Sequence, residues 1–191
     1  MFTLNCKGRL LVIDRPVVMG IINVTPDSFF AGSRVQTADA VVKQAETMLE
    51  QGAAIIDIGG QSTRPGSQAV SEDEELARVT RGIESIRRHF PESIISVVTY
   101  YSRVAREAVA AGASIVNDIS AGSFDAEMVE TVAALQVPYI LMHMQGTPQT
   151  MQQTPQYENV LREVFDFYRE NCSLAKSRHQ RYSDRPRLWF W

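Results

Sequence analysis

Five short apolar runs, each ending in polar residues, limit the folds open to this chain more than any other feature. Each run passes directly into Asn, Asp, Ser, Thr or His, and each is followed by a stretch with the spacing of an amphipathic helix. The runs are 17–22, 54–58, 94–98, 115–119 and 137–142. Their repetition predicts βαβ units and a parallel sheet, in which the polar strand ends gather at one edge and form the functional site.

Predicted helices and an N-terminal hairpin complete this pattern. The helices are expected at 37–51, 71–89, 102–111, 125–135 and 156–171. Ser71 is a candidate N-cap, with Glu74 three residues later as in a capping box. Before the first unit, residues 2–13 predict a β-hairpin with its turn at 5–8, which we expect to cover the bottom of the fold.

Composition and charge exclude several classes of protein. The chain has 191 residues and a formal net charge of -3, which suits one domain and does not suit a nucleic-acid binder. Its two cysteines, Cys6 and Cys172, lack the spacing of a metal site and favour a reducing compartment. No apolar stretch approaches the roughly 18 residues of a membrane-spanning helix, and the first residues lack the apolar segment of a signal peptide. We therefore expect a cytoplasmic protein that binds neither nucleic acid nor membranes.

Four segments resemble the signature segments of dihydropteroate synthases. They are GIINVTPDSF, DIGGQSTRPGS, NDIS and LMHMQGTPQTMQ, which occur in the family's order and at its spacing and cover roughly residues 2–176. The resemblance implies an α/β fold of the (β/α)8 TIM-barrel type, present here as about five βα units. It also implies a transferase of folate biosynthesis that joins p-aminobenzoate to 6-hydroxymethyl-7,8-dihydropterin diphosphate. The implied cofactor is Mg²⁺, and intact members of the family are expected to be homodimers.

Asn23 and the glycine-rich segment at 59–68 provide candidate metal and diphosphate contacts. An amide oxygen at a strand end suits Mg²⁺, which takes few protein ligands and completes its shell with water and phosphate. The resemblance makes Asn23 a metal contact, whereas the residue alone could simply cap its strand. Thr63 and Arg64 offer a hydroxyl and a guanidinium that suit a diphosphate. The resemblance makes both substrate contacts, although a Gly/Pro turn with a surface Arg explains the same residues.

Asn117 is the candidate for pterin recognition. A pterin edge alternates hydrogen-bond donors and acceptors, and an amide can satisfy both kinds. The resemblance implies that Asn117 holds the pterin, while a strand-to-turn transition at Asn117 and Asp118 is the alternative. Asp57 lies inside the second strand, where a structural hydrogen bond is at least as plausible as a ligand contact. His143 follows an apolar strand and is expected to be a barrel histidine rather than a catalytic base.

The segment after the first strand predicts a mobile loop. It includes Thr25, Pro26, Asp27, Ser28 and Phe29 and is too long and polar for a tight turn. Long loops at the functional end of strands are often mobile elements.

No residue of the chain is assigned as a catalytic acid, base or nucleophile, since the implied displacement needs no covalent enzyme intermediate.

Val98 departs from the family's pattern. The third strand reads Ser96-Val97-Val98-Thr99, where the family has a pterin-binding aspartate at the position of Val98. Valine cannot accept a hydrogen bond, so a buried donor of the ligand would remain unpaired, at a cost of about 1–3 kcal/mol. Valine also suits a strand better than aspartate does. The substitution predicts a stable but weakened substrate site.

The last segment, 177–191, differs in composition from the rest of the chain. It carries four Arg against Asp184, a charge of +3, compared with -6 for everything before it. We expect residues 1–176 to form a partial pterin-binding barrel domain and residues 177–191 to be an out-of-frame or disordered tail. One back-translation of 178–191, read one base later, gives GINDIVIDPGFGFG, an apolar strand followed by the Asp-Pro-Gly loop that the family has next. This coincidence favours a frameshift near Ser177, in the gene or in its sequencing.

Two other functions remain open at this point. One is a catalytically inactive, truncated barrel fragment, because the strands expected after the fifth would bring further substrate contacts. The other is a pterin- or folate-binding module of a methyltransferase. The segment NVTPDSFF, which resembles the loop that meets p-aminobenzoate, argues against the methyltransferase.

Overall fold

An antiparallel hairpin opens the chain. The computed structural model describes residues 1–24, 38–61, 70–148, 150–151, 153–179 and 188–190. Strand β1 (Phe2–Cys6) pairs with β2 (Arg9–Ile13) through Lys7 and Gly8, whose φ angles are 54° and 89°. Positive φ at both turn residues matches the twist of a two-residue hairpin, and the Asn5 side chain accepts a hydrogen bond from the Gly8 N–H at 2.7 Å. The predicted hairpin is confirmed.

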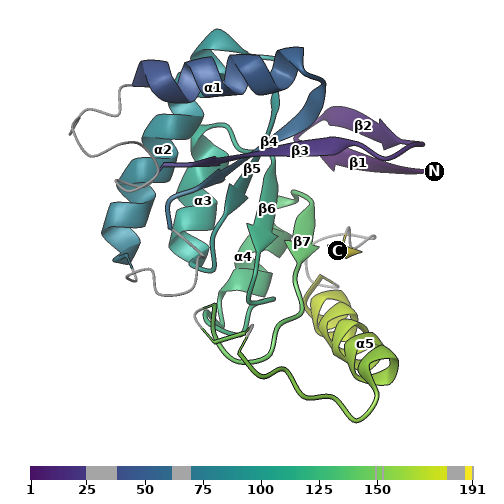
Figure 1. Cartoon of the computed structure of the whole chain (residues 1–191). Coiled ribbons are helices and arrows are strands. Elements are labelled where there is room, and N and C mark those ends of the chain that lie inside the picture. Colours follow the sequence, from purple (N-terminus) through teal and green to yellow (C-terminus); the bar gives the residue numbers. More distant parts are fainter. Residues whose placement is uncertain (25–37, 62–69, 149, 152, 180–187, 191) are drawn as a thin grey trace.

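A parallel sheet with alternating helices follows the hairpin (Figure 1). Its strands, in spatial order, are β3 (Val18–Asn23), β4 (Ala53–Gly59), β5 (Ile94–Val98), β6 (Ile115–Asp118), β7 (Tyr139–Leu141) and β8 (Leu188–Phe190). The helices are α1 (Ala38–Glu50), α2 (Glu72–His89), α3 (Ser102–Ala111), α4 (Met128–Leu135) and α5 (Val160–His179). Each neighbouring pair of strands is parallel, so the predicted βαβ units are confirmed.

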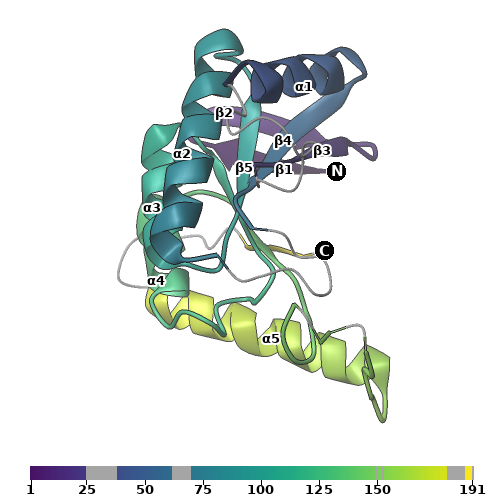
Figure 2. The ribbon, with the colours of Figure 1, turned by 60° about the vertical axis from the view of Figure 1, so that its left-hand side comes forward.

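The two faces of the sheet bury different partners. One face packs against the helices, and its core includes Ile22, Ile58, Val97 and Val116 together with Ile83 of α2. The other face is covered near the beginnings of its strands by the hairpin (Figures 1 and 2). That second core consists of Leu4, Cys6, Ile55, Ile94, Ile115 and Ile140. Helices on one face only are typical of a (β/α) barrel, since doubly wound sheets carry helices on both faces. The hairpin closes the bottom of this inner face, as predicted.

Three elements begin two or more residues later than predicted. Helix α4 starts at Met128 rather than 125, because Asp125 uses its carboxylate to accept hydrogen bonds from the N–H groups of Ser102 and Glu127. Helix α5 starts at Val160 rather than 156, because Asn159 caps it through the Arg162 N–H at 3.1 Å. Strand β7 covers 139–141 instead of 137–142, following Pro138, which has no N–H to donate.

The end of the chain contains regular structure that the sequence pattern does not predict. Helix α5 continues to His179, and β8 pairs in parallel with β7 as a sixth strand, where five were counted from the sequence. Strand pairing uses backbone groups, which hydrogen-bond whatever side chains they carry. The edge of β7 therefore pairs with β8 through backbone groups, which the pattern of side chains does not predict. Among the described residues, no helix combines the length and the apolar character needed to cross a membrane.

Candidate functional site

Three of the predicted site residues lie in one row across the carboxyl edge of the sheet. In the register of the strands, Asn23 lies beside Gly59, Gly59 beside Val98, and Val98 beside Asn117. Residues in register on parallel strands point to the same face, which here is the inner face that the helices leave free. The sequence places each residue at a strand end, and the structure brings them into one row.

The Asn23 amide lies over a glycine. A Cβ at position 59 would come within 3.2 Å of Asn23 Oδ1 and within 3.7 Å of the Val98 Cβ, so glycine keeps this part of the edge open. The described residues contain no group of three or more His, Cys, Asp or Glu side chains that could hold a metal ion. Because Mg²⁺ commonly takes one or two protein oxygens and completes its shell with water and phosphate, Asn23 fits a magnesium ion whose other ligands come from a substrate.

Asp57 lies below this row, inside the sheet. It is only 2% exposed, in register with Ser96, and its Oδ2 accepts a hydrogen bond from Asn117 Nδ2 at 3.1 Å. Burial raises the pKa of the Asp57 carboxyl, and the nearby Ser96 hydroxyl and Asn117 amide oppose the rise. The Ser96 hydroxyl nevertheless lies outside hydrogen-bond geometry, so the buried atoms Asp57 Oδ1 and Ser96 Oγ have no hydrogen-bond partner within the described part of the chain. A carboxylate with one free oxygen is unusual in a protein interior.

Asp118, next to Asn117 in the sequence, points to the opposite face. Its Oδ1 accepts from the Ser120 N–H at 2.7 Å and from the Ser120 hydroxyl at 2.8 Å. Its Oδ2 accepts from the Gly122 N–H at 2.7 Å and from the Tyr139 hydroxyl at 2.6 Å. Burial raises the pKa of Asp118 while these donors oppose the rise. With both oxygens satisfied by protein groups, Asp118 holds the β6 turn and β7 together, as the strand-to-turn alternative predicted for this residue.

A buried glutamate that sequence reasoning missed lies beside the glycine-rich segment. Glu75 of α2 is fully buried and accepts a hydrogen bond from the Gln61 amide, whose oxygen accepts another from the Tyr100 hydroxyl at 2.8 Å. Burial raises the pKa of Glu75. A Cβ at Gly60 would meet the Glu75 Cγ at 2.8 Å, so only glycine fits there. The signal was present in the sequence, because Glu75 continues the helical spacing of the buried Val79 and Ile83.

Ser71 caps α2 as predicted, accepting a hydrogen bond from the Glu74 N–H at 3.3 Å. His143 packs between the rings of Tyr157 and Phe167, with ring centroids 5.8 Å and 4.7 Å away. An imidazole held edge-on against an aromatic ring contributes packing. The structure thus supports the prediction that His143 is a packed barrel histidine.

The comparisons with known proteins agree with this geometry. A model of the family "Pterin binding enzyme" matches residues 19–179. The chain belongs to the pterin-binding enzyme family. It is 48% identical over 163 residues to the mitochondrial folate synthesis bifunctional protein of Pisum sativum, and 44% identical over 162 residues to the dihydropteroate synthase of Synechocystis. These matches cover 83% and 85% of this chain, but only 32% and 56% of the relatives.

Two solved structures of the Xanthomonas albilineans dihydropteroate synthase have the same fold. The structure with 4-aminobenzoic acid matches with a TM-score of 0.86 and 42% identity, covering 98% of this chain and 65% of that one. The structure with 7,8-dihydropteroate matches with a TM-score of 0.82 and 38% identity, covering 98% and 64%. This pterin-binding enzyme chain therefore spans about two thirds of those structures.

Two predicted segments of this family member lie outside the described residues. Thr63 and Arg64 fall within 62–69, and Thr25, Pro26, Asp27, Ser28 and Phe29 fall within 25–37. Their predicted roles stay predictions. Gln61, held by Glu75 and Tyr100, is the last described residue before 62–69. Val24, whose N–H donates to the Gly59 carbonyl at 2.8 Å, is the last described residue before 25–37.

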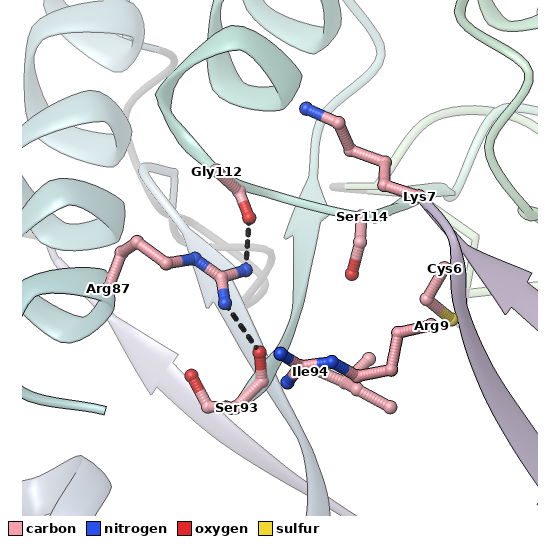
Figure 3. A pocket seen from close by; sticks show the side chains of 8 residues that line it. All are labelled: Cys6, Lys7, Arg9, Arg87, Ser93, Ile94, Gly112 and Ser114. Carbon is pink, nitrogen blue, oxygen red and sulfur yellow. Dashed lines mark hydrogen bonds between the residues drawn. The ribbon is translucent and has the colours of Figure 1, made fainter. Parts of the chain in front are cut away.

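A cavity at the opposite end of the sheet has a structural role. It has a volume of about 220 Å³ and is lined by Cys6, Lys7, Arg9, Arg87, Ser93, Ile94, Gly112 and Ser114 (Figure 3). The Arg87 guanidinium donates to the carbonyls of Ser93 and Gly112, drawn as dashed lines, while Lys7 donates to the Val109 carbonyl at 2.8 Å. Cations near helix C-termini satisfy backbone carbonyls that lack partners in the helix. These side chains attach the hairpin and α2 to the end of α3, far from the Asn23–Asn117 row.

Proposed function

We propose that this chain carries the pterin-binding part of a dihydropteroate synthase. The observation that supports this most strongly is the row of Asn23, Gly59, Val98 and Asn117 at the carboxyl edge of the sheet. The family's reaction forms a bond between the amine nitrogen of p-aminobenzoate and the methylene carbon of the pterin substrate. The carbon–oxygen bond to diphosphate breaks, diphosphate leaves with the bonding electrons, and the amine loses a proton.

Within this proposal, each residue of the row has a separate task. Asn117 binds the edge of the pterin ring, because its amide is half-buried and lies beside the inner face. Asn23, together with Thr63 and Arg64, receives the diphosphate end of the substrate. A magnesium ion held by Asn23 and the diphosphate oxygens would neutralise negative charge that builds up on the leaving group. Asp57 and Glu75 stay behind the row and support it.

Val98 distinguishes this chain from the family's pattern. Its side chain lies between Gly59 and Asn117, where a ligand's N–H donor would find no acceptor. We therefore propose that this chain binds the substrate weakly. We also propose that it shows no measurable turnover as a catalytically inactive barrel fragment, because it matches only 56% of the Synechocystis synthase and lacks the substrate contacts expected from strands after the fifth.

Calorimetry with 6-hydroxymethyl-7,8-dihydropterin diphosphate and Mg²⁺ tests the proposal. We expect binding that depends on Asn117 and weakens without Mg²⁺, and no dihydropteroate when p-aminobenzoate is added. An Asn117→Ala variant is the specificity control. Absence of binding to the chain at any substrate concentration reached would contradict the pterin site, and growth of a strain lacking the enzyme on this chain would contradict inactivity.

We also propose that the tail, 177–191, is out of frame with a longer barrel that dimerises in its intact form. The frame-shifted reading GINDIVIDPGFGFG supports this, since it supplies the next strand and loop of the family's pattern. DNA sequencing across codons 170–195 tests it directly, because a single missing or added base near codon 177 is the expected finding.

Two cysteines without a metal or disulfide pattern favour a cytoplasmic site of action.

A further inference from the structure

The unpaired oxygen of Asp57 indicates a role that its place in the strand does not reveal. Among the described residues, Asp57 Oδ1 and Ser96 Oγ are two neighbouring buried polar atoms without hydrogen-bond partners, on the inner face directly below the row of Asn23 and Asn117. A buried carboxylate with a single hydrogen bond is costly to keep. Its single partner is the side-chain amide of Asn117, the candidate pterin contact.

The direction of this hydrogen bond determines which end of the Asn117 amide faces Asp57. A carboxylate only accepts hydrogen bonds, so the Asn117 group facing it must be the NH₂. An amide has its oxygen on the other side of the same carbon, and Oδ1 therefore faces away from Asp57. Because Asn117 is half-buried while Asp57 is 2% exposed, the side away from Asp57 is the carboxyl edge.

We infer that Asp57 is a positioning residue: it holds the Asn117 amide with its oxygen toward the carboxyl edge, where it accepts a hydrogen bond from a ring N–H of the ligand. This inference rests on the proposed function and deepens it. With Val98 unable to accept, Asn117 Oδ1 is the acceptor left on the β5–β6 side of the row. The site thus selects ligands that present an N–H donor, such as the aminopyrimidine edge of a pterin.

Pterin fluorescence titrations on the whole chain test this positioning role, with 6-hydroxymethylpterin as the probe. Asp57→Ala frees the amide and is expected to raise the Kd about tenfold, which is the usual cost of one lost hydrogen bond. Asp57→Asn allows the Asn117 amide either orientation, so the Kd should rise only about twofold. In an Asn117→Ala background, Asp57→Ala should cause no further change. Tyr139→Phe, which removes one hydrogen bond on the opposite face of the sheet, is the control and should leave the Kd unaltered.

Two binding results would overturn the inference. They are an unchanged Kd in Asp57→Ala, and additive effects of Asp57→Ala and Asn117→Ala, which would mean that Asp57 acts independently of the amide. The NMR signals of the Asn117 NH₂ provide a readout that needs no ligand: they should shift and exchange faster with water in Asp57→Ala. If the wild-type chain binds no pterin, the proposed function fails, while these signals still decide whether Asp57 orients the amide. Unchanged NH₂ signals would sink the positioning role.

Discussion

Asp57 and Asp118 are buried aspartates on opposite faces of the same sheet, and their carboxyl groups differ in how many hydrogen bonds they accept. Asp118 faces the helices and accepts four hydrogen bonds, from Ser120, Gly122 and Tyr139. Asp57 lies on the inner face of the sheet and, among the described residues, accepts one hydrogen bond, from Asn117, while its second oxygen has no partner. A fully paired carboxylate stabilises the fold, whereas an underpaired one is retained at the expense of stability. The difference separates a structural aspartate from one that serves the site.

The largest effect expected from this comparison is on folding. Asp118→Ala removes the acceptor of four donors, including the buried Tyr139 hydroxyl, and should lower the free energy of unfolding by about 3 kcal/mol. Urea denaturation followed by circular dichroism measures this loss. Tyr139→Phe is the matched control, which removes one donor and should cost only about 1 kcal/mol. A loss below that of the control would mean that the four bonds do not stabilise the turn.

Val98→Asp should raise the affinity of the inner face for the pterin substrate. The new carboxylate would restore an acceptor between Gly59 and Asn117, and we expect about tenfold tighter binding of the pterin diphosphate. Calorimetry on both proteins measures the change, and Val98→Asn, an uncharged side chain whose amide oxygen also accepts, shows how much of the gain depends on charge. Equal affinities for the valine and aspartate proteins would show that position 98 does not contact the pterin.

The pH dependence of the free energy of unfolding tests what burial of the Asp57 carboxyl costs. Its pKa is raised in the folded protein, chiefly by burial, so its contribution to stability is present below the ordinary value of about 4 and is lost as pH rises through the raised pKa. In Asp57→Asn this loss disappears, and the new NH₂ can donate to the unpaired Ser96 Oγ. We expect the variant to be more stable than wild type by about 1 kcal/mol at pH 7 and equal to it near pH 3.

Denaturation curves of the two proteins at pH 3, 5 and 7 check this expectation. A wild-type protein that gains stability over the variant as pH rises would reverse the sign and place a cation or another donor beside Asp57.

The smallest effect is expected at Ser96. Its hydroxyl is fully buried and has no hydrogen-bond partner in the parts of the chain that the structure describes, so replacing Ser96 with Ala removes no hydrogen bond seen in the fold. Ser96→Ala should change the free energy of unfolding by less than about 0.5 kcal/mol. A matched Thr99→Ala variant, which removes the hydroxyl that accepts from the Tyr101 N–H at 3.1 Å, should cost more. A large loss at Ser96 would reveal a hydrogen bond to Asp57.

Sequence patterns predicted the elements well where local signals are strong. Strand β5 and helix α3 have the predicted bounds, and the Ser71 cap and the Lys7–Gly8 turn lie where polar and glycine residues suggested. Local signals misplaced the starts of α4 and α5. The Asp125 carboxylate accepts from the Ser102 N–H, a contact 23 positions away that helical spacing does not reveal. Asn159 caps α5 through the Arg162 N–H three positions later, a local signal that the apolar spacing of the helix obscured.

The sequence by itself determined the βαβ order, the family and the polar residues at the strand ends, because each of these is encoded in short stretches of the chain. Only the tertiary structure decided which polar residues share a face. Strands buried on both sides are apolar at nearly every position, so their alternation does not tell the inner face from the outer one. That is why Asn117 and Asp118 look alike in the sequence. The fold surrounds Asp118 with four donors. It brings Asp57 to Asn117, sixty positions away in the sequence, and the one hydrogen bond between them orients the Asn117 amide.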